Sequence, residues 1–209
     1  SMTNTSNIYN ATTTPILLGC SSGTCILTFV ATDSAGNVNS THNYTLTIDD
    51  TAPSVHSSDT DDSDNKVKSS DSINITVNVT DTNTINTVTV NGSSMSQAGD
   101  LWYLVNTTAE LCPSVSNGYC VLTFTATDIA GNINNTHTLS ILVDDTAPSV
   151  YGADTDDSDN KVKPNDSLNI TVTVTDVNTV SSVSVNGTTM TNAGNVWSTV
   201  NTTSDFGCS

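Results

Sequence analysis

Positive charge is almost missing from this sequence. It contains 4 Lys+Arg, all of them Lys, against 21 Asp+Glu, which gives a formal net charge of −17. A field this negative repels phosphate backbones and anionic lipid head groups. We therefore expect no nucleic-acid partner and no binding to a membrane surface.

Long apolar runs and aromatic residues are also scarce. Hydrophobic residues make up 35% of the chain and aromatic residues 5%. No stretch approaches the roughly 20 apolar residues that a membrane-spanning helix needs, so we expect no direct membrane insertion in this segment. No signal peptide is visible either, so any export signal would lie outside it. Such a polar composition is compatible with disorder, but the apolar residues alternate in short runs, which is typical of half-buried strands.

Signatures of catalysis are missing as well. The sequence shows no His–Ser–Asp arrangement and no glycine-rich phosphate loop, and Glu110 is its single Glu. The Asp residues fall in expected loops and junctions, without a recognisable general-acid partner. We expect that the protein is not an enzyme.

Small polar residues dominate instead, with 28 Ser, 38 Thr and 25 Asn. Thr favours strands, whereas Ser and Asn favour turns. The composition therefore predicts an all-β chain with many turns and without long amphipathic helices.

The sequence contains an internal repeat, since it matches itself at an offset of 95 residues. This repeat predicts the domain architecture. Residues 31–37 return as 126–132, residues 49–55 as 144–150, and residues 59–68 return unchanged as 154–163. A period of 95 exceeds that of solenoid and propeller units and matches the roughly 100 residues of one β-sandwich domain.

Strands follow from alternation within one unit. Ile73, Ile75, Val77 and Val79 alternate with polar residues, and so do Leu122, Phe124 and Ala126 and then Leu139, Ile141 and Val143. Further strands are expected at 88–90, 101–105 and near Val55, with a type I′ turn at Asn91-Gly92. Six or seven strands of this kind are enough for a sandwich of two sheets.

The motifs resemble a known group of domains. Ala-Thr-Asp-x-Ala-Gly-Asn (31–37, 126–132) is followed by Asp-Asp-Thr-Ala-Pro (49–53, 144–148), with Val-Asn-Gly-x-x-Met (90–95) and Gly-x-x-Trp (99–102) in the same unit. Together they resemble the immunoglobulin-like tandem repeats of large prokaryotic, archaeal or bacterial, cell-surface proteins and adhesins. The resemblance implies tandem immunoglobulin-like β-sandwich domains that act as spacers, stalks or binding tips.

The phase of the repeat predicts where the domains begin and end. Residues 51–145 form one complete repeat, 1–50 the C-terminal part of a preceding repeat, and 146–209 the N-terminal part of a following one. Two explanations remain open. The segment is a slice of a longer array, or its incomplete ends complete those of neighbouring chains and build a filament. The length exceeds two periods by 19 residues, so the ends carry overlapping copies, which argues against a clean exchange.

The cysteines indicate an oxidising compartment. Cys25 and Cys120 lie one period apart, and Cys20 and Cys112 hold equivalent places before them. Disulfides Cys20–Cys25 and Cys112–Cys120 are therefore expected, and Cys208 corresponds to Cys112. The spacing lacks the second pair that a zinc site needs, so disulfides are favoured over zinc. Disulfides persist in oxidising compartments, so we expect an extracellular location.

Glycosylation sequons support the same location. Asn-x-Ser/Thr occurs at 13 positions, more than the composition predicts by chance, although an Asn- and Thr-rich surface also makes sequons by accident. The candidate sites for N-linked glycans are Asn39, Asn74, Asn78, Asn91, Asn106, Asn134, Asn169, Asn186 and Asn201.

An acidic run is the strongest candidate for a ligand site. Alternating Asp residues turn several carboxylates toward one point in a loop, and Ca²⁺ prefers six to eight oxygen ligands. The candidate calcium ligands are Asp59, Asp61, Asp62 and Asp64, and in the second copy Asp154, Asp156, Asp157 and Asp159. The alternative is a solvated acidic loop that keeps the protein soluble.

Junction carboxylates are a second calcium candidate. Asp49, Asp50, Asp144 and Asp145, with Asp33 and Asp128 in the turns, lie where neighbouring domains meet. The resemblance implies that calcium stiffens such junctions.

Lysines and tryptophans have plain explanations. Lys66, Lys68, Lys161 and Lys163 follow the acidic runs, which favours ion pairs with adjacent Asp over an isopeptide bond to Asn. Trp102 and Trp197 recur one period apart, which favours a core role over sugar stacking.

These features predict a structural cell-surface protein. We expect a glycosylated array of repeats that forms a stalk, sheath, surface layer or filament, with copies of itself as partners. The alternatives are an adhesin whose loops 93–100 or 111–120 bind a glycan or a protein ligand, and an accessory module of a secreted enzyme.

Overall fold

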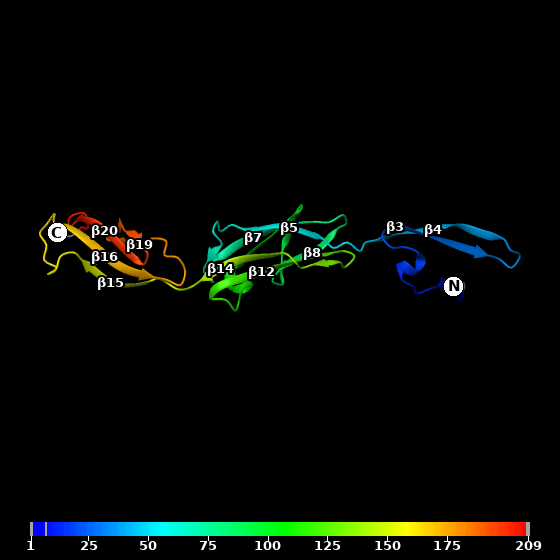
Figure 1. Cartoon of the computed structure of the whole chain (residues 1–209). Coiled ribbons are helices and arrows are strands. Elements are labelled where there is room, and N and C mark those ends of the chain that lie inside the picture. Colours follow the sequence, from blue (N-terminus) through cyan, green and yellow to red (C-terminus); the bar gives the residue numbers. More distant parts are fainter. Residues whose placement is uncertain (1, 7, 208–209) are drawn as a thin grey trace.

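Three β-rich parts follow one another along an elongated molecule in the computed structural model, which describes residues 2–6 and 8–207 (Figure 1). Strands hold 55% of the chain, so the prediction of a nearly all-β protein is confirmed. We call residues 2–50 the N-terminal part, 51–145 the middle part and 146–207 the C-terminal part. No helix in the described residues is long and apolar enough to cross a membrane.

The middle part contains two sheets. Their strand orders are β10-β11-β7-β5 and β6-β14-β12-β8-β9, with β13 added beside β12. All pairs are antiparallel except β6 with β14. The elements of this part are β5 (Ser54–Thr60), β6 (Lys66–Val67), β7 (Ser72–Thr80), β8 (Ile85–Val90), β9 (Ser93–Ser94), β10 (Ser96–Ala98), β11 (Leu101–Thr107), α1 (Thr108–Leu111), β12 (Asn117–Asp128), β13 (Ile133–Asn134) and β14 (Thr138–Asp144).

One hydrophobic core joins the two sheets of the middle part. Ile75 of β7, Val90 of β8, Phe124 of β12 and Ile141 of β14 are all fully buried within the same cluster. Successive residues of a strand point to opposite faces, so the predicted alternation places these side chains on the two inner faces. Trp102 is 5% exposed and belongs to the same core, as expected.

The β8–β9 hairpin contains the type I′ turn that its sequence predicts. Asn91 and Gly92 both have positive φ, at 46° and 85°, which is the conformation of a type I′ turn. Val90 pairs with Ser93 across it.

The N-terminal part is built around one long hairpin, β3 paired with β4. Its Cys25 pairs with Leu46 and its Phe29 with His42. β1 and β2 form a separate two-stranded sheet. The elements are β1 (Thr3–Thr5), β2 (Ile8–Asn10), the short 3₁₀ helix η1 (Pro15–Leu18), β3 (Gly23–Thr32) and β4 (Val38–Ile48).

The C-terminal part contains one four-stranded sheet, β15-β16-β20-β19, and the small hairpin β17–β18. A second and smaller core is formed by four of its buried residues, Val172, Val174, Met190 and Trp197. The strands are β15 (Ser149–Thr155), β16 (Ser167–Thr175), β17 (Ser184–Val185), β18 (Thr188–Thr189), β19 (Thr191–Ala193) and β20 (Val196–Thr202).

The two copies repeat the same register 95 residues apart. Val77 pairs with Trp102 between β7 and β11, and Val172 pairs with Trp197 between β16 and β20. The hairpin β3–β4 corresponds in the same way to β12 and β14. The N-terminal part therefore carries the counterparts of late strands of the middle part, and the C-terminal part carries the counterparts of its early strands.

Candidate functional site

Three carboxylates from three strands meet where the N-terminal part joins the middle part. Asp49 follows β4, Asp81 follows β7, and Asp128 ends β12. One oxygen from each lies within 4.8 Å of the others. Asp128 is only 1% exposed, whereas Asp49 and Asp81 are half-buried.

Asp128 is held in place by its own turn. Its Oδ1 accepts hydrogen bonds from the backbone N–H groups of Gly131 and Asn132, at 2.7 and 2.9 Å, and its Oδ2 accepts one from Asn132 Nδ2 at 2.8 Å. Burial raises the pKa of this carboxyl, but the bonds from Asn132, Gly131 and Ala130 outweigh burial and hold the pKa below its ordinary value. Asp128 therefore stays ionised while buried.

The other two carboxylates keep oxygens available. Asp49 Oδ1 accepts a hydrogen bond from Thr51 N at 3.1 Å, and Asp81 Oδ1 accepts one from Asn83 N at 2.7 Å. Asp49 Oδ2 is buried without a hydrogen-bond partner among the described residues. Three clustered carboxylates repel one another unless a cation lies between them, and Ca²⁺ is the hard cation that takes such oxygen ligands.

Sequence reasoning named Asp49 and Asp128 as junction ligands but missed Asp81. A usable signal was present, because an Asp directly follows the alternating strand in both copies, as Asp81 and as Asp176.

Two amides anchor the linker beside these carboxylates. Asn132 Nδ2 donates to the Asp49 carbonyl at 3.1 Å, and Asn134 Nδ2 donates to the Pro53 carbonyl at 2.8 Å. The turn that holds Asp128 thus also holds the chain that leads into β5. The structural role of these two Asn residues was not foreseen from the sequence.

The second junction contains only part of this arrangement. Asp176 is the counterpart of Asp81, and its Oδ2 is buried without a partner among the described residues. Asp144, the counterpart of Asp49, accepts a hydrogen bond from Thr146 N at 3.0 Å. Asp145 accepts one from Ser69 N at 2.8 Å. Hydrogen bonding from the Ser69 side chain, and then from its backbone N–H, holds the pKa of the Asp145 carboxyl below its ordinary value.

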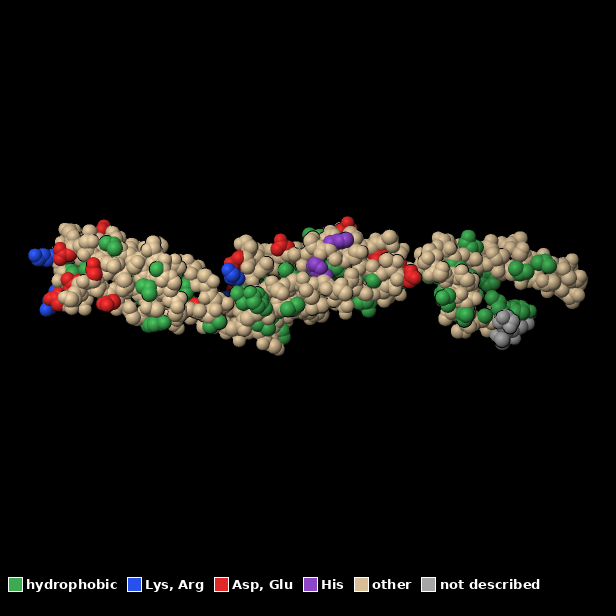
Figure 2. Space-filling view, in the orientation of Figure 1, with side chains coloured by type: hydrophobic (Ala, Val, Ile, Leu, Met, Phe, Trp, Pro, Cys, Tyr) green, Lys and Arg blue, Asp and Glu red, His purple; other side chains and the backbone are tan. Residues whose placement is uncertain are grey.

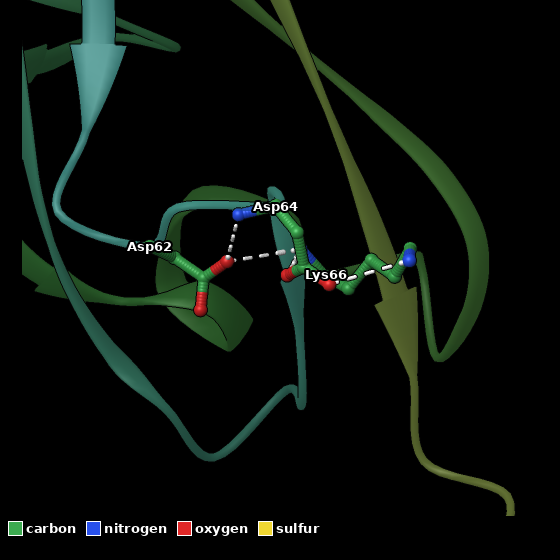
Figure 3. A network of polar contacts seen from close by, with 3 residues as sticks. All are labelled: Asp62, Asp64 and Lys66. Carbon is green, nitrogen blue, oxygen red and sulfur yellow. Dashed lines mark hydrogen bonds and ion pairs between the residues drawn. The ribbon is translucent and has the colours of Figure 1, made fainter. Parts of the chain in front are cut away.

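The acidic run of the middle part turns its carboxylates toward local donors (Figure 3). Asp62 Oδ1 accepts from the backbone N–H groups of Asp64 and Lys66, both at 3.2 Å, and Asp64 Oδ2 pairs with Lys66 Nζ at 3.2 Å. Asp61 accepts from Asn74 N, and Asp59 from the adjacent Thr60 N.

The second acidic run repeats these contacts. Asp157 accepts from Asp159 N and Lys161 N, Asp156 accepts from Asn169 N, and Asp154 accepts from Thr155 N. Among the described residues, the carboxylates that come together as a three-ligand group are those at the junction, Asp49, Asp81 and Asp128. The acidic runs themselves do not converge in this way, so calcium at them stays a prediction.

Two of the four lysines form exposed ion pairs. Lys66 pairs with Asp64 at 3.2 Å and Lys161 pairs with Asp159 at 3.8 Å. The side chain of Lys66 is 54% exposed, so it lacks the buried environment that an isopeptide bond needs. Exposed pairs of this kind contribute little to stability.

Disulfides join Cys20 to Cys25 and Cys112 to Cys120, the pairs that the spacing indicates. All four cysteines are buried. Each bridge closes a short loop before a strand, so it restrains that loop more than the whole part. The prediction for Cys208 lies outside the described residues.

The glycosylation candidates differ in whether the side-chain Nδ2, to which a glycan would be attached, already donates a hydrogen bond. Asn91 Nδ2 donates to the carbonyls of Leu111 and Val121, at 2.9 and 3.3 Å, and Asn186 Nδ2 donates to the Phe206 carbonyl at 2.8 Å. Asn134 Nδ2 donates to the Pro53 carbonyl at 2.8 Å as well. A glycan on any of these three nitrogens would replace these bonds, which makes Asn91, Asn134 and Asn186 the weakest candidates. The candidates also differ in solvent exposure. The exposed ones are Asn39, Asn91 and Asn186. The half-buried ones are Asn74, Asn78, Asn106, Asn134, Asn169 and Asn201.

Comparisons with known proteins do not establish a family for this chain. No protein-family model and no curated protein matches the chain. A solved structure from a 1.5-MDa bacterial ice-binding adhesin, described in connection with retention at the host cell surface, is similar at 20% identity and a TM-score of 0.39. The match covers 90% of this chain and 66% of that one, just under two thirds of its length. A TM-score this low does not establish a shared family or function.

Proposed function

We propose that the chain is a structural, non-enzymatic part of an extracellular array of immunoglobulin-like repeats, forming a stalk, sheath, surface layer or filament. The observation that carries this proposal is the repeated register of the two copies. β7 with β11 and β16 with β20 pair through equivalent residues 95 positions apart, in parts that follow one another along an elongated molecule (Figure 1).

The architecture of the middle part supports the immunoglobulin-like assignment. Two mostly antiparallel sheets enclose one core, and the buried Trp102 lies within it. Sandwiches of this kind have about 100 residues and pack two such sheets face to face. This supports residues 51–145 as a complete repeat.

Two disulfides support an extracellular location, because such bonds persist in oxidising compartments and are rare in the cytosol. Exposed sequons such as Asn39 then serve as attachment sites for N-linked glycans.

Calcium is the proposed cofactor at the junction of Asp49, Asp81 and Asp128. A cation shared by these carboxylates ties β4 of the N-terminal part to β7 and β12 of the middle part. Together with the linker bonds from Asn132 and Asn134, it would stiffen the junction between two repeats.

Immunogold labelling of intact native cells with antibodies against the purified chain tests the function. Regular labelling along a surface filament, sheath or layer is expected. Absence of label on intact cells, with label confined to the interior of sectioned cells or to a soluble secreted complex, contradicts the proposal. A glycan array probed with the same chain separates the rival role, because reproducible binding of one glycan favours an adhesin.

A further inference from the structure

A row of apolar side chains lies uncovered on the outer face of the middle part. Leu101, Tyr103 and Val105 of β11 are 42%, 40% and 62% exposed, and they alternate with Trp102 and Leu104, which pack in the core. Successive residues of a strand point to opposite faces, so these three face away from the core. We call them the β11 row. Exposed apolar side chains that lie side by side are typical of a surface that something covers, whereas single ones are ordinary.

The neighbouring strand β7 carries two glycosylation sequons beside this row, Asn74-Ile-Thr and Asn78-Val-Thr. Asn78 pairs directly with Leu101. Tyr103 pairs with Thr76, so it is the diagonal neighbour of both Asn74 and Asn78. Diagonal neighbours on one face of an antiparallel pair lie roughly 7–8 Å apart, which is within reach of an aromatic side chain. A sugar on either Asn would therefore start beside the β11 row.

The three strands that form this face are uncharged. β7, β10 and β11 contain no Asp, Glu, Lys or His, although the chain has 21 Asp+Glu. Figure 2 shows one side of the molecule, where uncharged polar side chains and backbone make up most of the surface and acidic side chains appear as scattered spots. A neutral sugar matches such a face, whereas a charged partner would find no complementary charge on it.

The two Asn side chains of β7 have different surroundings. Asn74 Oδ1 is buried without a hydrogen-bond partner among the described residues, and so is Oδ1 of its counterpart Asn169. Asn78 is half-buried, but neither atom of its amide is closed off in this way, and the amide makes no hydrogen bond to the described residues. Asn78 Nδ2 can therefore carry a sugar without giving up a hydrogen bond, unlike the three weakest candidates above.

The two copies change together at the ring and at one sequon. Thr173 stands where Asn78 stands in the middle part, and Ser198 stands where Tyr103 stands, in the same register of paired strands. The sequon of Asn74 is kept in the second copy although the aromatic ring is lost. This pattern connects the ring to the sequon at Asn78.

We propose that Asn78 carries an N-linked glycan whose first sugar, a neutral pyranose, packs over Tyr103 and Leu101. This inference rests on the proposed function, for which it names the modified residue and the surface that the glycan covers. The C–H face of a pyranose is apolar, so packing on the ring and on the adjacent leucine removes apolar area from water on both sides. The glycan thereby takes the place of a covering protein layer on this sheet.

The attachment step uses a lipid-linked glycan phosphate as donor, in a reaction catalysed by a transferase of the cell. A bond forms between Asn78 Nδ2 and C1 of the first sugar, while the C1–O bond to the donor phosphate breaks. Nδ2 loses one proton, and the lipid phosphate leaves with the bonding electron pair. Val79 in the middle of the sequon is fully buried in the folded chain, so the transfer precedes the pairing of β7.

Mass spectrometry and hydroxyl-radical footprinting of the chain purified from its native cells test the proposal. Peptide mapping should find Asn78 occupied. Tyr103 should be oxidised several-fold more slowly in this chain than in Asn78→Gln from the same cells, because the sugar covers its ring. Tyr119 is 74% exposed on β12 of the other sheet, so it should be oxidised equally in both and serves as the internal control.

Two further variants separate the sequons from effects on folding. Thr80→Ala removes the same sequon but keeps Asn78, so it should expose Tyr103 as Asn78→Gln does. Asn74→Gln removes the neighbouring sequon of the same face and should leave Tyr103 protected. An unoccupied Asn78 overturns the proposal, and so does equal oxidation of Tyr103 with and without the Asn78 sequon. Loss of protection in Asn74→Gln while Asn78 stays occupied also overturns it.

The same measurements distinguish this inference from the proposed function. Surface labelling of native cells together with an unoccupied Asn78 overturns the inference alone and leaves the proposed function standing. An occupied Asn78 with a protected Tyr103, in a chain found only in a soluble secreted complex, supports the inference and overturns the proposed function.

Discussion

At the scale of single residues, one Asp organises each turn after a late strand. Asp33 and Asp128 each accept hydrogen bonds from backbone N–H groups and from the amide of the Asn four residues later. The pKa of both carboxyls is held below its ordinary value, chiefly for Asp33 by the Asn37 side chain. A carboxylate is required because it offers acceptors on both oxygens.

The depressed pKa of Asp128 predicts how stability depends on pH. The native state binds this proton less readily than the unfolded state, so the stabilisation is complete above the ordinary Asp value of about 3.9 and is lost as pH falls through the lower native value. Asp128→Asn should lower the melting temperature at pH 7, since its amide would face the Asn132 amide donor to donor. The difference from the unmodified chain should shrink below about pH 4.

Differential scanning calorimetry from pH 7 to pH 2 measures this difference. Asp59→Asn is the control, because among the described residues the Asp59 carboxylate accepts a hydrogen bond only from the adjacent Thr60 N. A constant gap between Asp128→Asn and the unmodified chain across this range would contradict the assigned role.

At the scale of strands, the sequence predicted what local alternation determines. The inward residues of β7 and β12, the type I′ turn at Asn91 and the cysteine pairs all depend on neighbours close in sequence. The length of β8 could not be predicted, because it depends on pairing with β12, which is 34 residues away from β8 at the Val90–Phe124 pair. The position of Asp81 after its strand is visible in the sequence, but its meeting with Asp49 and Asp128 could not be predicted, since three separate strands bring these carboxylates together.

The junction of those three strands predicts a response to calcium. With calcium about a hundredfold above its dissociation constant, the melting midpoint should rise by on the order of 10 °C, and excess chelator should reverse the rise. Asp81→Asn should abolish the shift, whereas Asp62→Asn in the acidic run should retain it. Equal melting midpoints with calcium and with chelator would contradict calcium binding at this junction.

At the scale of the whole molecule, equivalent strands recur 95 residues apart in parts that bury them to different extents. The middle part contains counterparts of the apolar face of the N-terminal hairpin and of the open sheet of the C-terminal part. It buries these two counterparts against each other in one core. A net charge of −17 makes copies of the chain repel one another at low salt, and added salt screens this repulsion.

Hydrogen–deuterium exchange of two peptides one period apart tests this claim most directly. Residues 118–127 of β12 have paired strands on both sides, whereas residues 23–32 of β3 pair with β4 alone. The account predicts that the peptide 23–32 exchanges much faster than 118–127, because β3 has one paired strand among the described residues and β12 has two. Equal protection of the two peptides would contradict it.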